Sequence, residues 1–396
     1  MRLLFVLARV TSPPTSGDTV RHVALLRAAR RVADRLDVVT LPHGDLDPAA
    51  PTGAAGELVD DLVVVGEQME RYLRSPVERA RSLLGRPYHD AVGRSGPLRR
   101  AVAERLAAHE YDAVVAGQLY VVSAVPAEWR GRTVFDTHNV ETERTAAFLA
   151  LRGGAFRLSA PSVVAGVRRL ERGAVRSSAV TIACSDHDAG QLRAMSPGAD
   201  VRVVLNGADL PATPKQQRAE ARTALLLASL SSGANVDSVV HLVDDVLPHL
   251  PPDVVVQVAG SGAGPDVRAV LARAGARVTF LGEVPDAREA MRQADVLLVP
   301  LRVGSGTRLK VLEAFALGLP VVATPKAVEG LPVQPGTHAA VTADPRAFAD
   351  QVVRLLGSVQ DRQDMAVAAR ELVERTASWD AVTPEFVAAL RDAAAR

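Results

Sequence analysis

The sequence predicts an α/β fold made of two successive series of parallel strands and helices. Short apolar runs, such as residues 3–8 and 254–259, have the composition of strands that are buried on both faces of a parallel sheet. Between such runs lie segments with apolar residues three or four positions apart, which is typical of amphipathic helices. A polar stretch at residues 211–222 separates the two series, so we expect the 396 residues to form at least two domains.

Composition excludes several classes of protein. The net charge of +1 gives no global attraction to nucleic acid, and the 48% hydrophobic content supports sizeable cores. Cys184 is the one cysteine, which excludes an intramolecular disulfide and a cysteine-cluster metal site. No apolar run approaches the roughly 20 residues that a membrane-spanning helix needs. Because Arg9 interrupts the first apolar run, we interpret that run as a strand rather than a signal peptide, and we expect a soluble, cytoplasmic protein.

The first series opens with a strand at residues 3–8 and a helix at residues 19–36, followed by a strand at residues 37–41. Gly17 precedes this helix and permits a ligand to approach its start. The loop is not a P-loop, because no Gly-Lys-Ser/Thr follows. The spacing places four apolar side chains of the helix toward the sheet: Val20, Val23, Leu26 and Ala29.

Residues 71–105 are rich in arginine. One interpretation is a docking surface for an anionic acceptor or a membrane surface. The alternative, favoured by the interspersed acidic residues, is a set of solvated helix faces. The arginines are Arg71, Arg74, Arg79, Arg81, Arg86, Arg94, Arg99, Arg100 and Arg105.

Polar residues follow the strand predicted at residues 133–136. Asp136, His138 and Glu141 lie at its carboxyl end, where open α/β sheets bind ligands. His138 can hydrogen-bond a sugar hydroxyl or orient a nucleophile, although a lone histidine is more often structural. A later strand at residues 179–184 leads to Ser185, which we expect to cap the next helix.

The strand at residues 254–259 ends in Gly260-Ser261-Gly262-Ala263-Gly264. This run and Glu283 resemble a dinucleotide-binding fingerprint. The spacing is GxGxG rather than GxGxxG and Pro265 follows at once, so a nicotinamide site is the weaker interpretation.

Residues 302–324 carry the strongest signal. A strand at residues 295–300 leads into the loop Gly304-Ser305-Gly306, and a helix is predicted from about Thr307. Gly318 lies where a left-handed C-cap belongs, and Pro320 prevents the helix from continuing. A further strand follows at residues 321–323, and the chain from about residue 347 is predicted to be mostly helical.

This unit has the chemistry of a nucleotide site. The first N–H groups of a helix have no intrahelical partner, and the macrodipole adds partial positive charge there. Arg308 and Lys310 add formal charge at the same end, and the glycines permit close approach of a phosphate. Glu313, further along the helix, can accept hydrogen bonds from ribose hydroxyls. The simpler alternative is an ordinary glycine-initiated helix with Glu313 on a solvated face.

Two Asp-x-Asp triplets, Asp45-Leu46-Asp47 and Asp186-His187-Asp188, are candidates for holding a divalent metal. The first lies in a predicted loop and the second at a helix start, so we predict no metal site.

Taken together, these motifs resemble those of the retaining GT-B glycosyltransferases of family four, formerly group 1. The matching motifs occur in family order over nearly the whole chain. They are Ser16-Gly17, the run from Asp136 to Glu141, the run from Ala183 to Asp186, the run from Asn206 to Asp209, the run from Gly282 to Asp286, and Gly304 through Val322.

The resemblance implies two Rossmann-like domains that face a central cleft. The implied organisation is an N-terminal acceptor domain at residues 1–208, a nucleotide-sugar-binding domain at residues 209–372, and a helix at residues 373–396 that crosses back to the first domain.

The resemblance also implies roles for individual residues. Glu313 would bind ribose, and the backbone of Thr307, Arg308 and Leu309 would hold the diphosphate. The backbone of Glu283 and Val284 would touch the base, while His138 would contact the donor sugar near its anomeric carbon. Gly17 would let the first loop close over the phosphates. The implied reaction is metal-independent transfer of a sugar, with retention, from a nucleotide-diphosphate sugar, with UDP-sugar as the expected donor and no further cofactor.

Two departures from the family motif concern the donor. Ser305 stands where the family usually has a glutamate that contacts the donor sugar, so the sequence resembles the subset that lacks this residue. Residues 229–235 carry no cation where the family often has an arginine and a lysine. We therefore expect Arg308 and Lys310 to supply the charge that faces the diphosphate.

Three other functions share these features. They are a nucleotide-sugar epimerase or phosphorylase on the same fold, a non-catalytic nucleotide-sugar-binding protein, and a dehydrogenase that uses residues 260–264. The acceptor is either a soluble small molecule or a lipid or polysaccharide. In the lipid case we expect peripheral membrane contact through residues 71–105.

Overall fold

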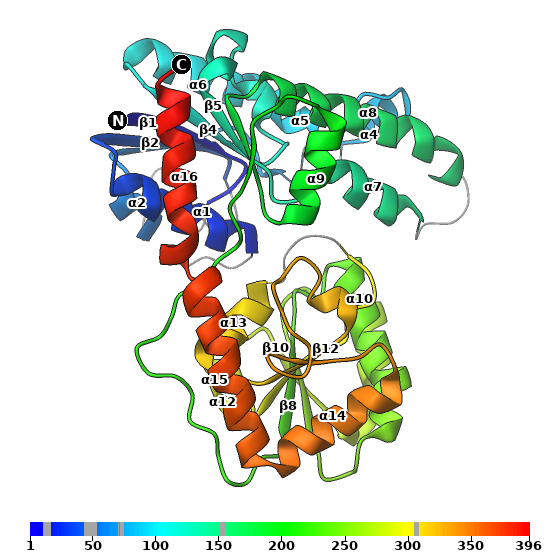
Figure 1. Ribbon diagram of the computed structural model, residues 1–396. Coiled ribbons are helices and arrows are strands. Elements are labelled where there is room, and N and C mark those ends of the chain that lie inside the picture. Colours follow the sequence, from blue (N-terminus) through cyan, green and yellow to red (C-terminus); the bar gives the residue numbers. More distant parts are fainter. Residues whose placement is uncertain (11–16, 43–53, 70, 72–74, 151–155, 305–308) are drawn as a thin grey trace. The chain divides into compact units, whose positions relative to one another are not determined.

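The structure is a computed structural model that describes residues 1–10, 17–42, 54–69, 71, 75–150, 156–304 and 309–396. The chain divides into two compact units (Figure 1). Unit 1 comprises Met1–Leu205 and Val382–Arg396, and unit 2 comprises Asn206–Ala381. Each unit is a parallel sheet covered by helices, so the predicted fold class is confirmed.

Unit 1 contains a seven-stranded parallel sheet with the strand order β3-β2-β1-β4-β5-β6-β7. The predicted strands are present with ends shifted by one or two residues, whereas β3, a short and half-buried edge strand, was not predicted. The strands are β1 (Arg2–Leu7), β2 (Arg35–Thr40), β3 (Asp61–Val64), β4 (Ala113–Gly117), β5 (Thr133–Asp136), β6 (Val180–Ala183) and β7 (Val201–Val203).

The helices of unit 1 are α1 (Gly17–Arg30), α2 (Ala54–Leu58), α4 (Pro76–Leu83), α5 (Asp90–Gly93), α6 (Gly96–Ala108), α7 (Glu141–Ala150), α8 (Phe156–Ser177) and α9 (Asp186–Met195), with 3-10 turns η1 (Val122–Ala124) and η2 (Ala127–Arg132). The prediction that Val20 faces the sheet was wrong, because Val20 is half-buried. Arg21 and His22, the next two residues of α1, are buried instead. Ser185 caps α9 as predicted, because its hydroxyl accepts the Asp188 N–H at 3.1 Å.

Unit 2 contains a six-stranded parallel sheet with the strand order β10-β9-β8-β11-β12-β13. Its strands are β8 (Thr223–Leu227), β9 (Val255–Ala259), β10 (Val278–Gly282), β11 (Val296–Val299), β12 (Val321–Ala323) and β13 (Ala340–Val341). Its helices are α10 (Gly233–Val240), η3 (His241–Val246), η4 (Leu247–His249), α11 (Pro265–Ala274), η5 (Gly275–Arg277), α12 (Ala287–Gln293), α13 (Leu309–Leu317), η6 (Pro325–Ala327), α14 (Pro345–Gly357) and α15 (Val359–Thr376).

The last helix, α16 (Trp379–Ala394), begins in unit 2 and ends in unit 1. Its Phe386 is fully buried, and the ring lies 6.4 Å from that of Phe5 on β1. Along the chain, the boundaries between the units fall after Leu205 and after Ala381. The boundaries expected from the sequence were after residues 208 and 372. The second boundary lies later because α15 packs on α13 and therefore remains part of unit 2.

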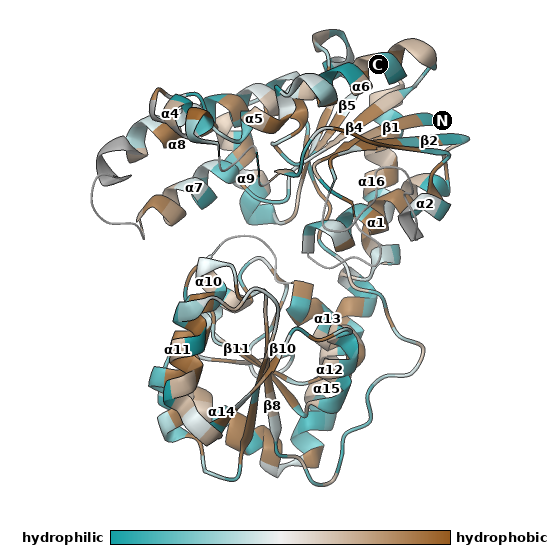
Figure 2. Cartoon of the chain, turned by 180° about the vertical axis from the view of Figure 1, so that it is seen from behind, coloured by the Kyte–Doolittle hydropathy of each residue, from teal (hydrophilic) through white to brown (hydrophobic). Residues whose placement is uncertain are grey.

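Hydrophobic residues, coloured brown in Figure 2, concentrate on the strands of both sheets. A large buried cluster lies in unit 1, and two clusters lie in unit 2. Both faces of the central strands are covered, so β4 and β11 are buried and apolar along their whole length, which explains why they could be recognised in the sequence. Among the residues that the structure describes, no helix has the length and apolarity needed to cross a bilayer.

Candidate functional site

Each sheet has a point where the strand order reverses, and ligands of open α/β sheets bind beyond the carboxyl ends of the strands there. In unit 1 this point lies between β1 and β4, and in unit 2 between β8 and β11. In unit 1 the sequence-derived candidates lie at the start of α1 and in the loop that follows β5. In unit 2 they lie in the loops that follow β10 and β11 and on α13.

The loop that follows β11 leads into α13. Gly304 has a φ of +120°, a conformation that side chains disfavour, so glycine is required at this turn. Leu309 and Lys310 begin the described part of α13, and Leu309 is buried. Four predicted contacts to the donor, Ser305, Gly306, Thr307 and Arg308, fall outside the described residues.

The end of α13 has the predicted cap. Gly318 has a φ of +79°, and the Leu319 N–H donates to the Ala314 carbonyl at 2.8 Å. This is the hydrogen bond of a Schellman motif, which satisfies a carbonyl at the helix end. Seven of the nine residues of α13 are buried, so the helix is anchored on nearly all sides.

Glu313 is one of the two α13 residues that are not buried, and its carboxylate is half-buried. Burial raises its pKa, nearby Asp209 and Asp286 raise it further, and Arg288 opposes them. Arg288 donates to Asp209 at 2.8 Å. Within the described part of the chain, Glu313 has no hydrogen-bond or ion-pair partner of its own. A half-buried carboxylate without a partner is a site for hydroxyl donors of a ligand.

The loop after β10 contains the two residues expected to touch a base. Gly282 has a φ of +70°, and Glu283 is exposed beside the half-buried Val284. The side chain of Asp286 then caps α12 by accepting the N–H of Arg288 at 2.8 Å. The cap fixes the end of this loop, so its backbone is held at the same sheet edge as α13.

The glycine run after β9 has a packing explanation. A Cβ on Gly260 would lie 1.7 Å from the Ala228 carbonyl oxygen, and one on Gly262 would lie 2.9 Å from Ser231 Cβ. The Leu230 N–H also donates to the Ser261 carbonyl at 2.7 Å. These glycines therefore permit the loops after β8 and β9 to approach each other, and the packing accounts for them without a dinucleotide.

In unit 1, a buried ion pair fixes the carboxyl end of β5. Arg21 of α1 and Asp136 are both 1% exposed, and they are joined by Nη2–Oδ1 and Nε–Oδ2 contacts of 2.7 and 3.0 Å. Burial alone would raise the pKa of Asp136, but the Arg21 guanidinium and His138 hold it well below its usual range. Arg21 also donates to the carbonyls of Val204 and Leu205 at 3.1 and 3.3 Å.

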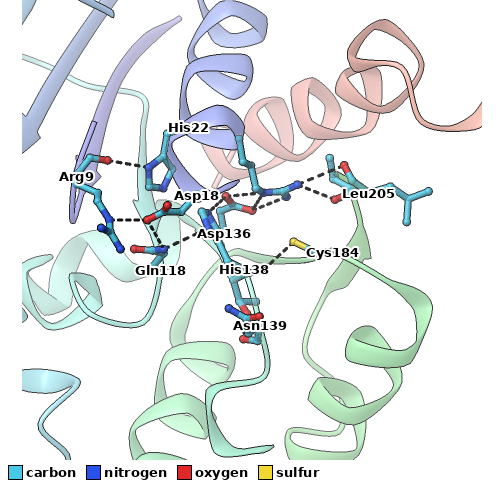
Figure 3. A network of polar contacts seen from close by, with 12 residues as sticks. Arg9, Asp18, His22, Gln118, Asp136, His138, Asn139, Cys184 and Leu205 are labelled. Atoms are coloured by element: carbon cyan, nitrogen blue, oxygen red, sulfur yellow. Dashed lines mark hydrogen bonds and ion pairs between the residues drawn. The ribbon is translucent and has the colours of Figure 1, made fainter. Parts of the chain in front are cut away.

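His138 is held from two sides (Figure 3). Its Nε2 lies 3.2 Å from Asp136 Oδ2, and its Nδ1 lies 3.3 Å from Gln118 Nε2. The amide nitrogen of Gln118 is a donor, so His138 Nδ1 accepts this hydrogen bond. His138 Nε2 therefore carries the ring proton and donates a hydrogen bond to Asp136. This tautomer orients the ring, and Gln118 itself adopts an unusual φ of +74° at the end of β4.

Most of the residues around Asp136 and His138 were not predicted from the sequence. Arg21, His22 and Gln118 were not singled out, although a buried arginine and histidine inside an apolar helix leave a detectable mismatch in its periodicity. The His22 and His138 rings lie 4.8 Å apart, and His22 Nδ1 bonds the Arg9 carbonyl at 2.9 Å. Burial and the nearby His138 lower the pKa of His22 to about 3, so it is neutral at physiological pH.

A second polar cluster follows His138 in the chain. Glu141 is buried and pairs with His89 Nε2 at 3.2 Å and with Arg144 at 2.9 Å. Glu171 of α8 accepts the Glu141 and Thr142 N–H groups at 2.6 and 3.1 Å, and so caps α7. Burial raises the pKa of Glu171 to about 7, against the opposing effect of these hydrogen bonds.

Metal ligation was not predicted. Among the described residues, no group of three or more His, Cys, Asp or Glu side chains could hold a metal ion. The triplet Asp45-Leu46-Asp47 lies outside the described residues, and Asp188 of the other triplet is used in capping α9.

Comparison with known proteins was made for the whole chain. Residues 221–358 match the family described as "Glycosyl transferases group 1". These matched residues all belong to unit 2. A phosphatidyl-myo-inositol mannosyltransferase of Mycobacterium leprae is 31% identical over 139 residues, which span 34% of this chain and 37% of that relative.

Solved structures match the whole chain. Sucrose-phosphate synthase from Thermosynechococcus elongatus has a TM-score of 0.72 at 16% identity, covering 98% of each chain. HepE from Anabaena, in complex with UDP and glucose, has a TM-score of 0.68 at 16% identity, covering 99% of each chain. These matches confirm the predicted GT-B fold, and residues 221–358 are similar to the group 1 family that the sequence motifs resemble.

Proposed function

We propose that this protein transfers a sugar from a nucleotide-diphosphate sugar to an acceptor hydroxyl, with retention of the anomeric configuration. The observation that carries the proposal is Glu313, a half-buried carboxylate that has no hydrogen-bond or ion-pair partner among the described residues. It lies in the segment that matches the group 1 family, at the carboxyl edge of the unit 2 sheet. Ribose hydroxyls would donate to this carboxylate, and the loop with Glu283 and Val284 would receive the base.

The diphosphate would lie at the start of α13. We propose that Lys310 and Arg308 supply positive charge there, since residues 229–235 contain no cation. Another nearby cation, Arg302, is already paired with Asp237 at 2.7 Å. Stabilising the charge that develops on the leaving diphosphate is the main catalytic requirement of the reaction, and it needs no metal.

His138 is proposed to contact the donor sugar. Its ring is oriented by Asp136 and Gln118, so it can position a sugar hydroxyl without acting as a nucleophile. In the front-face mechanism of retaining enzymes, the leaving phosphate itself helps to remove the acceptor proton, so no protein carboxylate need form a covalent intermediate. Paired carboxylates of the glycosidase type are therefore not required.

We propose UDP-sugar as the donor, because solved HepE structures contain UDP and UDP-glucose. The acceptor panel should begin with phosphatidyl-myo-inositol, which the name of the 31% identical relative includes. Soluble polyols and polysaccharides would complete the panel.

The test is a thermal-shift panel with UDP, GDP, TDP and ADP. We expect one nucleotide to raise the melting temperature of the wild type and to lose this effect in Glu313→Ala. The matched control is Glu289→Ala, which removes an exposed glutamate of α12 and should keep the shift. Equal shifts in both variants would contradict the assignment of Glu313. Replacing both Arg308 and Lys310 by glutamine should weaken nucleotide binding sharply, and unchanged affinity would refute their role.

Turnover separates the alternatives. Release of free nucleotide diphosphate only in the presence of an acceptor indicates transfer, whereas conversion of the donor without acceptor indicates epimerisation. Binding without turnover over the whole panel would favour a non-catalytic protein, with Ser305 as the first residue to examine.

A further inference from the structure

Unit 1 contains a pocket of about 620 Å³, which is lined by residues of α4, α5, α6 and α8 and of the turn between α4 and α5. The four helices are labelled in Figure 1. Its charged lining consists of five arginines and one aspartate, namely Arg81, Arg86, Arg94, Arg99, Arg169 and Asp90. These arginines come from separate elements, so the tertiary structure gathers them although they are spread over 89 positions of the chain.

Two of the arginines are neutralised by carboxylates. Arg94 contacts Asp90 at 3.0 Å and Glu78 at 2.9 Å. Arg81 contacts the other oxygen of Glu78 at 2.5 Å. These pairs fix Arg81 and Arg94 beside α4 and α5, and they engage one oxygen of Asp90 and both oxygens of Glu78.

The other three arginines have no such partner. Within the described residues, no carboxylate lies at ion-pair distance from Arg86, Arg99 or Arg169, and no hydrogen bond uses their guanidinium groups. These three side chains are exposed, so water screens their mutual repulsion, and an anion that contacted several of them at once would gain from their combined positive charge.

Close backbone packing holds two of these arginines near each other. A Cβ on Gly166 of α8 would lie 2.5 Å from the Gly85 carbonyl oxygen, and Gly85 has a φ of +74°. The two glycines therefore seat the turn before Arg86 directly on α8, three residues before Arg169. The positions from which these two guanidinium groups extend are fixed before any ligand binds.

We propose that this pocket binds a phosphate group carried by a small polyol or by a lipid headgroup. A phosphate has several oxygens that can accept from different guanidinium groups at once, whereas a carboxylate is satisfied by one planar fork. The volume exceeds that of a phosphate alone, which leaves room for the group that bears it. None of the donor residues proposed above lines this pocket.

The experiment measures binding of glucose 6-phosphate, inorganic phosphate and unphosphorylated glucose by titration calorimetry. The full-length protein is also mixed with phosphatidylcholine vesicles that contain or lack phosphatidylglycerol. The test variants are Arg99→Gln, Arg169→Gln and the double variant. The control is Arg100→Gln, which removes the same charge from an exposed neighbour on α6 that does not line the pocket.

We expect phosphate-bearing probes to bind and glucose not to bind. Each single test variant should weaken binding about tenfold, the lower end for a charge-assisted hydrogen bond, while Arg100→Gln should match the wild type. Binding of glucose 6-phosphate identifies a soluble source of the phosphate, and binding only to phosphatidylglycerol vesicles identifies a lipid source.

Two results would overturn the proposal. One is the absence of saturable binding to every phosphate-bearing probe, and the other is equal weakening by Arg100→Gln and the test variants, which would indicate general surface charge. The nucleotide thermal shift is measured separately, so failure here does not affect the donor site, and failure there does not affect this pocket.

Discussion

Replacing Arg21 by methionine would leave the Asp136 carboxylate, which is 1% exposed, without its guanidinium partner, and the His138 N–H would remain as a donor to it. The substitution removes the contacts of 2.7 and 3.0 Å to Asp136 and the hydrogen bonds to the carbonyls of Val204 and Leu205, which follow β7. Breaking a buried pair by removing one partner costs about 3–5 kcal/mol of unfolding free energy. We expect a loss in this range for unit 1.

The assay is urea denaturation followed by circular dichroism, on the wild type, Arg21→Met, Asp136→Asn and the double variant. The double variant should recover much of the loss, because it removes the charge that Arg21→Met leaves buried. A loss below about 1 kcal/mol for Arg21→Met would refute the reasoning, since such a value is typical of an exposed pair.

The pH dependence gives a second check. In the wild type the pKa of Asp136 is depressed, so its stabilising contribution is present above its unfolded pKa of about 3.9 and is lost only as the pH falls through the folded value. Without Arg21, burial should raise this pKa above the unfolded value. Protonation would then favour folding, so the deficit of Arg21→Met should shrink between pH 8 and pH 5. A deficit that stays constant would argue against a buried charge as its cause.

Three further predictions concern other parts of the chain. The raised pKa of Glu171, about 7, means that the folded state binds a proton more tightly than the unfolded state, so wild-type stability should fall between pH 4.5 and 7. Urea titrations should show a flatter profile for Glu171→Gln, and identical profiles would contradict the assignment. His138→Ala should lower turnover about 100-fold while the nucleotide-induced thermal shift persists; loss of both would indicate a structural role. Gly260→Ala should destabilise unit 2 by about 2–4 kcal/mol in urea, because its Cβ would overlap the Ala228 carbonyl, whereas Gly264→Ala, with open space around its Cβ, should cost under about 1 kcal/mol. Similar losses for the two glycines would refute the packing explanation.

The sequence alone determined the α/β class, the succession of strands and the identity of α13 as an anchored helix with a glycine cap. These features are local, because a strand buried on both faces is apolar throughout and a left-handed cap requires glycine. The family motifs are also contiguous in the chain, so Glu313 and His138 could be singled out before the fold was known.

Only the tertiary structure decided which side chains meet. The partnership of Arg21 with Asp136 joins residues 115 positions apart, and the arginine pocket combines α4 and α6 with α8. The spacing of apolar residues indicates that a helix has a buried face, but it does not indicate which residues that face contacts. The environment of Glu313, the tautomer of His138 and the packing of Gly260 depend on those distant contacts, and only the folded chain brings them together.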